Sequence, residues 1–169
     1  DILVNNAGES IKNGTTKDKW GQSFDINVTA HVILSELVIP HLEKSKIGGN
    51  IVNISSIFGR ESGGNPQYNA SKAAMISFSK SYANLLIKKG IRVNTIAPGS
   101  IRFTGGTWDK RVKNEPKEMR NFIQQNLPAG RFGTANEIAD VVTFVCSPKA
   151  SWIVGSAINV DGGQSRSNI

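Results

Sequence analysis

Tyr68 and Lys72 are four positions apart in a segment with a helical apolar pattern, so their side chains lie one turn apart on one face. A free tyrosine has a pKa near about 10 and exchanges protons poorly at neutral pH. A nearby ammonium group favours the phenolate and lowers that pKa, which allows a tyrosine to act as a general acid or base. Ser56, upstream of the pair, could donate to a substrate oxygen and stabilise developing charge. Taken alone, such a pair is more often two surface neighbours on a helix.

The elements that position these residues are indicated by apolar spacing and by helix-ending residues. Short runs of β-branched and apolar residues predict strands at residues 1–5, 50–55, 91–97 and 156–160. Helical spacing predicts helices at residues 20–44, 66–89, 117–125 and 135–146. Pro66 suits a first helical turn and Gly90 suits a helix end, whereas residues 100–115 are expected to form a loop.

Alternating strands and helices predict βαβ units and a mostly parallel sheet, within a single domain over residues 1–169. Such sheets bind ligands beyond the carboxyl ends of their strands. Small or polar residues follow three of the four predicted strands: Asn5, Asn6, Ala7 and Gly8, then Ser55 and Ser56, then Pro98 and Gly99. We therefore expect the chemistry at this edge of the sheet.

Composition and charge limit the other classes of function. The formal net charge is +7, but the lysines and arginines are scattered without a long block, which favours a solvated surface over a nucleic-acid site. No apolar run approaches the roughly 20 residues of a membrane helix. The single cysteine, Cys146, fits a cytoplasmic protein, and His31 and His41 lie in no ligand cluster, so no metal is expected.

Six motifs occur in order and together resemble the classical short-chain dehydrogenase/reductase family over nearly the whole chain. They are Asn5-Asn6-Ala7-Gly8, Asn27 in Asp25-Ile26-Asn27-Val28, Ser55-Ser56, Tyr68-x-x-x-Lys72, Arg92-Val93-Asn94 and Pro98-Gly99. The segment 159–163 also resembles the ending of that family. The most similar group is that of 3-oxoacyl-carrier-protein reductases and small alcohol or sugar dehydrogenases.

The resemblance implies hydride transfer between NAD or NADP and a small carbonyl or alcohol substrate. It implies Tyr68 as the catalytic acid/base and Lys72 as the residue that lowers its pKa and holds the nicotinamide ribose. Ser56 would orient the carbonyl, and Asn27 would hold a water that links Lys72 to solvent. Further cofactor contacts would come from Asn5, Ala7 and Gly8 on the adenosine side, and from Pro98, Gly99 and Ile101 on the nicotinamide side.

The 169 residues contain no glycine-rich loop of the kind that binds a dinucleotide pyrophosphate. The resemblance therefore implies the C-terminal part of a Rossmann-type doubly wound parallel sheet, with the N-terminal βαβ units missing upstream of Asp1. We expect the chain alone to bind cofactor weakly or not at all and to be inactive. The family also implies a homodimer or homotetramer, because the helices that form its contacts are retained.

Several alternatives stay open at the level of sequence. Asn5, Asn6, Pro98 and Gly99 could be plain turn residues, Asn27 could face solvent, and Ser55 is expected to be structural. The Ser56-to-Tyr68 interval is one residue shorter than is usual, and Phe103 stands where the family often has threonine. The chain could instead be a non-catalytic oligomeric fragment, or part of an epimerase or dehydratase that uses the same Tyr-x-x-x-Lys pair.

Overall fold

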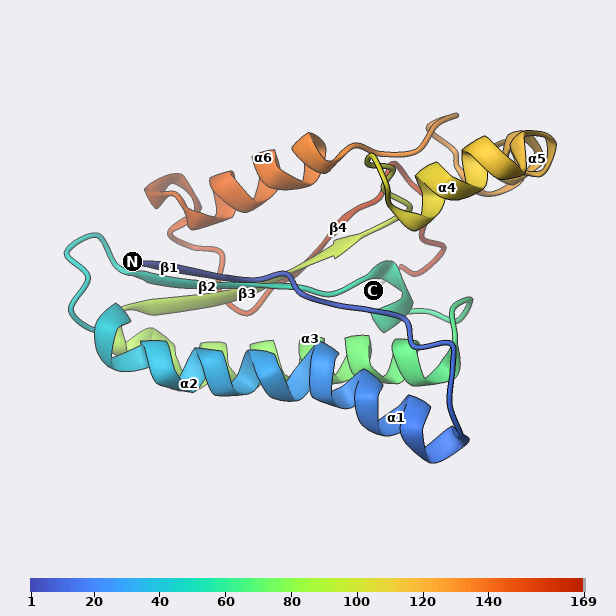
Figure 1. Cartoon of the computed structure of the whole chain (residues 1–169). Helices are drawn as coiled ribbons and strands as arrows, with labels where there is room; N and C mark the ends of the chain where they lie inside the picture. The colour runs from blue at the N-terminus through green and yellow to red at the C-terminus, as the bar shows by residue number, and fades with distance from the viewer. Residues whose placement is uncertain (169) are drawn as a thin grey trace.

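The computed structural model describes residues 1–168 and consists of a four-stranded parallel sheet with helices on both faces (Figure 1). The strands pair in chain order: β1 (Ile2–Asn5), β2 (Gly49–Ile54), β3 (Ile91–Pro98) and β4 (Ala157–Val160). One face is covered by α1 (Thr16–Phe24), α2 (Ala30–Leu42) and α3 (Pro66–Leu86), and the other by α6 (Ala135–Cys146). Two short helices, α4 (Thr107–Asn114) and α5 (Pro116–Asn126), lie beyond one end of the sheet. The parallel α/β architecture predicted from the sequence is confirmed.

The two central strands are buried on both faces, which explains their nearly continuous apolar sequence. Every residue of β2 is buried. Ile51 packs toward α2 and α3 together with Val93 of β3, whereas Val52 packs toward α6 together with Ile96. Because successive side chains of a strand point to opposite faces, each central strand contributes to both apolar cores.

The first helix begins at Thr16, earlier than the apolar spacing predicted. The Thr15 hydroxyl accepts the Asp18 backbone N–H at 3.2 Å, and the Asp18 carboxylate accepts the Thr15 backbone N–H at 3.0 Å. This reciprocal capping box satisfies two donors that a helix start leaves open. The expected helix is present through Leu42, but its middle adopts π geometry at Asp25–Thr29, which divides it into α1 and α2.

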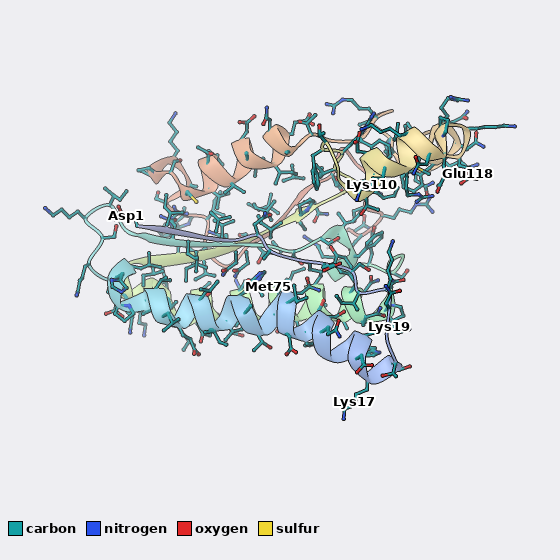
Figure 2. The ribbon with its side chains drawn as sticks, viewed as in Figure 1. Asp1, Lys17, Lys19, Met75, Lys110 and Glu118 are labelled. Carbon is teal, nitrogen blue, oxygen red and sulfur yellow. The ribbon has the colours of Figure 1, made fainter. Side chains whose placement is uncertain are left out.

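The long helix α3 matches its prediction closely. Pro66 occupies its first turn, and the chain leaves the helix through a short 3₁₀ turn, Ile87–Lys89, before Gly90 adopts a left-handed φ of +74°. Its buried face includes Met75, which lies in the layer between the sheet and the helices (Figure 2). Lys17 projects from α1 and Lys110 lies on α4, far apart in the structure (Figure 2). None of the helices within residues 1–168 is long and apolar enough to span a membrane.

Residues 100–115 were expected to be a loop, and this prediction is wrong because the segment contains α4. Asp109 lies in the first turn of that helix, where a carboxylate is favoured by the helix dipole. Its oxygens accept from Lys113 at 2.6 Å, from Arg102 at 3.0 Å and from the Gly105 backbone at 3.1 Å. The hydrogen bonds to Lys113 and the Gly105 backbone are the main reasons why the pKa of Asp109 falls to about 2. These polar contacts stabilise a helix that apolar spacing does not reveal.

A chain of buried polar side chains joins β1 and β2 to α2 and α3. The Asn5 amide donates to Asn53 Oδ1 at 2.7 Å and to Ser35 Oγ at 3.1 Å. The Asn53 amide in turn donates to Ser79 Oγ at 2.8 Å. None of these four side chains belongs to a residue more than 2% exposed. Because buried polar groups need partners, this network restricts how the two helices can lie against the strands.

We expect Asn53→Ala to lower the free energy of unfolding by about 2–4 kcal/mol, because it leaves the buried Asn5 amide without its shortest bond and opens a small cavity. Urea denaturation followed by circular dichroism measures the change. Asn13→Ala, in the exposed loop before α1, is the control and should shift stability by less than about 0.5 kcal/mol. Equal effects of the two substitutions would show that the buried network does not stabilise the fold.

Candidate active site

The polar residues that follow the strands gather around a cavity of about 750 Å³ at the carboxyl edge of the sheet. This is the edge where parallel α/β sheets bind ligands. The cavity wall combines residues from the loop after β1, the ends of β2 and β3, and the first turns of α3: Asn6, Gly8, Ser56, Tyr68, Lys72 and Pro98. The side of α6 that faces the sheet closes the cavity with apolar residues, among them Ile138 and Val142.

The two serines after β2 have different surroundings. Ser56 lies at the start of a 3₁₀ turn, Ile57–Gly59, where its hydroxyl accepts the Phe58 backbone N–H at 3.2 Å. It also forms a side-chain hydrogen bond with Tyr68. The Ser55 hydroxyl instead donates to the Lys72 backbone carbonyl at 2.8 Å, which ties β2 to α3. Ser55 therefore has the structural position expected of it, and Ser56 is the serine that meets Tyr68.

Tyr68 and Lys72 both face the cavity from α3. The Lys72 ammonium lies 5.7 Å from the centroid of the Tyr68 ring and donates to the Ile54 carbonyl at 2.9 Å. Lys72 is only 3% exposed, and no carboxylate within residues 1–168 pairs with it, which is rare for a buried lysine. An ammonium held in this way interacts strongly with any group that enters the cavity, because little water screens it.

Burial has the largest effect on the pKa values of Tyr68 and Lys72. It lowers the pKa of Lys72 from 10.5 to about 8. Burial also raises the pKa of Tyr68 above its ordinary 10.0, and the hydrogen bond from Ser56 only opposes this. The lowering of the Tyr68 pKa that was expected from Lys72 is therefore not seen here. The reason is that desolvation disfavours charge on both groups and exceeds the effect of an ammonium more than 5 Å from the ring centroid.

Asn27 lies in the π turn between α1 and α2 and is fully buried, so the solvent-facing alternative is wrong. Its side-chain oxygen accepts the Glu9 backbone N–H at 2.9 Å, and its amide donates to the Glu9 carbonyl at 2.9 Å. The amide also lies 3.1 Å from Ser71 Oγ, one residue before Lys72. The extra residue of a π turn shifts a side chain relative to an α-helix, and such turns are frequent at functional sites. Here it brings Asn27 to the loop that follows β1.

The residues after β1 divide between the core and the cavity. Gly8 and Asn6 line the cavity, and a Cβ added at Gly8 would lie 2.9 Å from Lys72 Nζ and 3.1 Å from Asn27 Oδ1. The Asn5 side chain points instead into the buried amide network, away from the cavity. Ala7 is exposed and does not line the cavity. Of the three predicted adenosine-side residues, the structure thus brings only Gly8 to the cavity, beside Lys72.

The three residues predicted on the nicotinamide side, Pro98, Gly99 and Ile101, all line the cavity. Gly99 has no room for a side chain, because a Cβ there would lie 2.7 Å from Gln164 Oε1. The same Gln164 oxygen accepts the Ser100 backbone N–H at 2.7 Å. The segment after β3 is therefore fixed by the C-terminal part of the chain and is not a plain turn.

His31 is a residue near the site that sequence reasoning did not select. It is 1% exposed, and within residues 1–168 neither ring nitrogen has a partner at ordinary hydrogen-bond geometry. Burial and the positive charge of Lys72 lower the pKa of His31, while the Ala7 backbone opposes the shift. The one available signal was its position, one helical turn after Asn27. A buried imidazole whose pKa is lowered therefore lies within the electrostatic influence of Lys72.

Known proteins resemble the chain over almost its whole length. Residues 1–165 match the family profile described as enoyl-(acyl carrier protein) reductase. An uncharacterized oxidoreductase of Schizosaccharomyces pombe is 35% identical over 166 residues, which cover 96% of this chain and 63% of that protein. A 3-oxoacyl-[acyl-carrier-protein] reductase of Thermotoga maritima is 34% identical over 169 residues, which cover 96% of this chain and 65% of that protein. The chain thus spans somewhat less than two thirds of the length of these curated relatives.

Solved structures agree with this likeness. The L-sorbose reductase of Gluconobacter frateurii, complexed with NADPH and L-sorbose, superposes with a TM-score of 0.88 at 33% identity over 99% of this chain and 67% of that chain. A 7α-hydroxysteroid dehydrogenase, complexed with NADH and 7-oxo-glycochenodeoxycholic acid, gives a TM-score of 0.85 at 35% identity over 99% of this chain and 64% of that chain. The Rossmann-type α/β fold is thereby confirmed, and the chain belongs to the short-chain dehydrogenase/reductase family.

Proposed function

We propose that the whole protein is an NAD(P)-dependent oxidoreductase that interconverts a carbonyl and an alcohol, with Tyr68 as the acid/base. The observation that carries this proposal is that Ser56, Tyr68 and the buried Lys72 line one cavity. Two structural neighbours, complexed with NADPH and with NADH, support a nicotinamide cofactor. Relatives named as reductases support the direction of the chemistry.

The residues around the cavity fit such a cofactor. Lys72 uses one of its three N–H donors on Ile54, so the others are available for the ribose hydroxyls. Gly8 lets the backbone approach the ammonium more closely than any side chain would allow. Pro98, Gly99 and Ile101 would contact the nicotinamide. On the adenosine side we propose Gly8 and Ala7, with Asn5 contributing only through its backbone because its side chain is engaged in the core.

The cofactor supplies the hydride when bound, and this chain's residues manage the oxygen. The Ser56 hydroxyl would donate to the substrate carbonyl oxygen and hold it beside Tyr68. Tyr68 would give its phenolic proton to that oxygen as the carbonyl becomes an alcohol. The raised pKa keeps the proton on Tyr68 beforehand, and the charge of Lys72 stabilises the phenolate that remains.

We propose that Asn27 is a positioning residue and not a side-chain ligand of water. Both polar atoms of its amide already bond to the Glu9 backbone or to Ser71. Those bonds hold the loop after β1 against α3, so that Gly8 stays next to the Lys72 ammonium. The relay role that the resemblance implies would then fall to main-chain atoms of the π turn.

The same residues are compatible with other reactions, which have less support from the structure. An epimerase or dehydratase could use the Tyr68–Lys72 pair, but no contact in the cavity favours it over the carbonyl chemistry.

Association into a homodimer or homotetramer is supported by apolar side chains left exposed on α2, namely Ile33, Leu34 and Leu37. The same exposure fits a non-catalytic oligomeric chain. The cytoplasmic location stays a prediction.

We expect Tyr68→Phe in the whole protein to reduce the turnover number for carbonyl reduction on the order of 10²–10⁴-fold, because a positioned proton donor is lost. Cofactor affinity should change little, since the ring and Lys72 remain. Steady-state kinetics together with cofactor titration measure both. Tyr82→Phe is the matched control, since Tyr82 lies on the same helix with its hydroxyl bonded to Glu36 on the surface. Near-normal turnover by the Tyr68 variant would end the assignment.

We expect Lys72→Met to stabilise the protein below pH 8 by about 1–3 kcal/mol, because a shift from 10.5 to about 8 means that folding disfavours the ammonium by that order. Below pH 8 the lysine is charged in both states, and the full desolvation cost applies. Between about pH 8 and 10.5 the unfolded chain binds more protons than the folded chain, so wild-type stability rises with pH. The advantage of the variant should therefore vanish toward pH 10.5.

Urea denaturation at several pH values, with the exposed Lys80→Met on the same helix as control, tests this expectation. A constant difference between Lys72→Met and wild type from pH 7 to pH 10.5 would mean that Lys72 is not desolvated.

We expect the 169-residue chain, produced alone, to bind NADH and NADPH with dissociation constants above about 1 mM. Pyrophosphate groups are bound by successive backbone N–H groups at a glycine-rich helix start, and the 169 residues contain no such loop. Isothermal titration calorimetry measures the affinity. Micromolar binding that Gly8→Ala removes would show instead that the residues around Lys72 suffice to hold the cofactor.

A further inference from the structure

A second cavity of about 790 Å³ adjoins the catalytic one. Trp108 lines both cavities. Ser56 and Gly99 border the first cavity, and the next residue in each case, Ile57 and Ser100, borders the second. The two cavities therefore meet at Trp108 and at the segments that follow β2 and β3.

The outer wall of the second cavity is held together by the Glu61 carboxylate, which binds the C-terminal segment of the chain. Glu61 Oε2 accepts from the Ser165 hydroxyl at 2.9 Å and from the backbone N–H groups of Arg166 at 2.8 Å and Ser167 at 3.1 Å. Gln164, in the same C-terminal segment, bonds to the Ser100 backbone. The wall is thus a hydrogen-bonded part of the fold and not an accidental gap between loops.

Charge in the second cavity is unbalanced in favour of cations. Its wall contains Arg60, Arg111 and Arg166 but only one acidic residue, Glu61. The neutral donors that satisfy Glu61 leave its charge in place, so the four charged wall residues carry a net charge of +2. Arg60 is tied to the Ala157 carbonyl and to Asn159 Oδ1 at 2.8 and 3.2 Å, which makes it a structural cation.

Arg111 is the cation best placed to bind a ligand. Its guanidinium lies 5.3 Å from the centroid of the Trp108 ring, the residue shared by both cavities. Its Nε donates to Glu115 at 3.1 Å, but both side chains of that pair are about 40% exposed, so the pair is screened and contributes little. The other guanidinium N–H groups of Arg111 can therefore donate to a ligand. A planar guanidinium binds a carboxylate through two parallel hydrogen bonds.

The surface between Ser56 in the first cavity and Arg111 in the second is aromatic. Trp108 stacks on Phe122 with ring centroids 4.8 Å apart, and Phe58 also lines the second cavity. An apolar or aromatic body is the chemistry that this surface would bury. A single negative charge suits the site better than a dianion, because Glu61 repels a second one.

We propose that the second cavity binds the carboxylate end of a carbonyl-bearing or hydroxyl-bearing organic acid whose apolar body lies on Trp108. Arg111 is then a specificity-determining residue, and the carbonyl of the same molecule reaches Ser56 and Tyr68. The identity of the reacting carbonyl rests on the proposed function, whereas the carboxylate site itself does not.

The probe is 3-(4-acetylphenyl)propanoate, and its primary amide is a neutral ligand of nearly the same shape. In the 169-residue chain, ¹H–¹⁵N spectra should show both ligands shifting the Trp108 indole signal, and only the acid shifting the Arg111 Nε signal. We expect roughly tenfold tighter binding of the acid, as for loss of one charged hydrogen-bonding pair, and loss of that preference in Arg111→Gln. Arg120→Gln, on the exposed side of α5, is the control and should retain the preference.

In the whole protein, the ratio of kcat/KM for acid over amide should fall to near one in Arg111→Gln while turnover of the amide is retained. Equal binding of acid and amide by the wild-type chain, or equal loss in Arg120→Gln, would overturn the proposal. Tighter binding of 4-acetylphenyl phosphate than of the acid would overturn the carboxylate assignment. If the acid binds as expected but neither ligand is reduced, the carboxylate site stands and the proposed oxidoreductase function fails.

Discussion

The structure around the cavity depends on keeping the Lys72 ammonium almost entirely out of water. Desolvation is unfavourable for that charge, and its pKa falls to about 8. The surroundings must therefore be small and must offer oxygen atoms: Ile54 accepts from the ammonium, and a Cβ at Gly8 would lie 2.9 Å from it. On the backbone side, a Cβ at Gly59 would lie 2.8 Å from the Lys72 carbonyl, which Ser55 also bonds. The loop after β1, the end of β2 and the turn after it all meet at this one residue.

A second set of buried polar side chains, further along α3, explains why the helix does not rotate to expose the Lys72 ammonium to water. Ser79 lies seven residues, about two turns, after Lys72 and accepts the Asn53 amide, which in turn accepts from Asn5. Rolling α3 to bring Lys72 toward solvent would break these bonds in the middle of the sheet, where no water replaces them. The direction of Tyr68 is thus fixed by two strands and not by its own turn of helix.

Patterns of residues close in the sequence predict the features that depend on neighbouring residues alone. The spacing of Tyr68 and Lys72, the strands buried on both faces, and the helix between Pro66 and Gly90 follow from periodicity and from the conformations of proline and glycine. The π turn at Asn27 does not, because its advantage comes from Glu9 and Ser71, which lie 18 and 44 residues away. The helix α4 is not evident from the sequence because its stabilising contacts come from charges on Asp109 and from packing of Trp108 and Val112 on residues that lie beyond the helix. The position of Asn5 in its motif predicts a cofactor contact, whereas the structure places its side chain in the buried amide network.

The walls of the two cavities differ in the kind of contact that holds their charged groups. Lys72 is fixed by buried hydrogen bonds within a few residues of strand ends, where replacing a contact would leave a polar group unsatisfied. Arg111 is held by an exposed ion pair and by the face of Trp108, contacts that water and salt already weaken. A ligand anion can bind the N–H groups of Arg111 that do not donate to Glu115, whereas loss of the Ile54 carbonyl would leave the Lys72 ammonium without its acceptor. The proposed acid/base chemistry therefore rests on residues at buried strand ends, and the proposed selectivity rests on α4 and on the C-terminal segment that Glu61 binds.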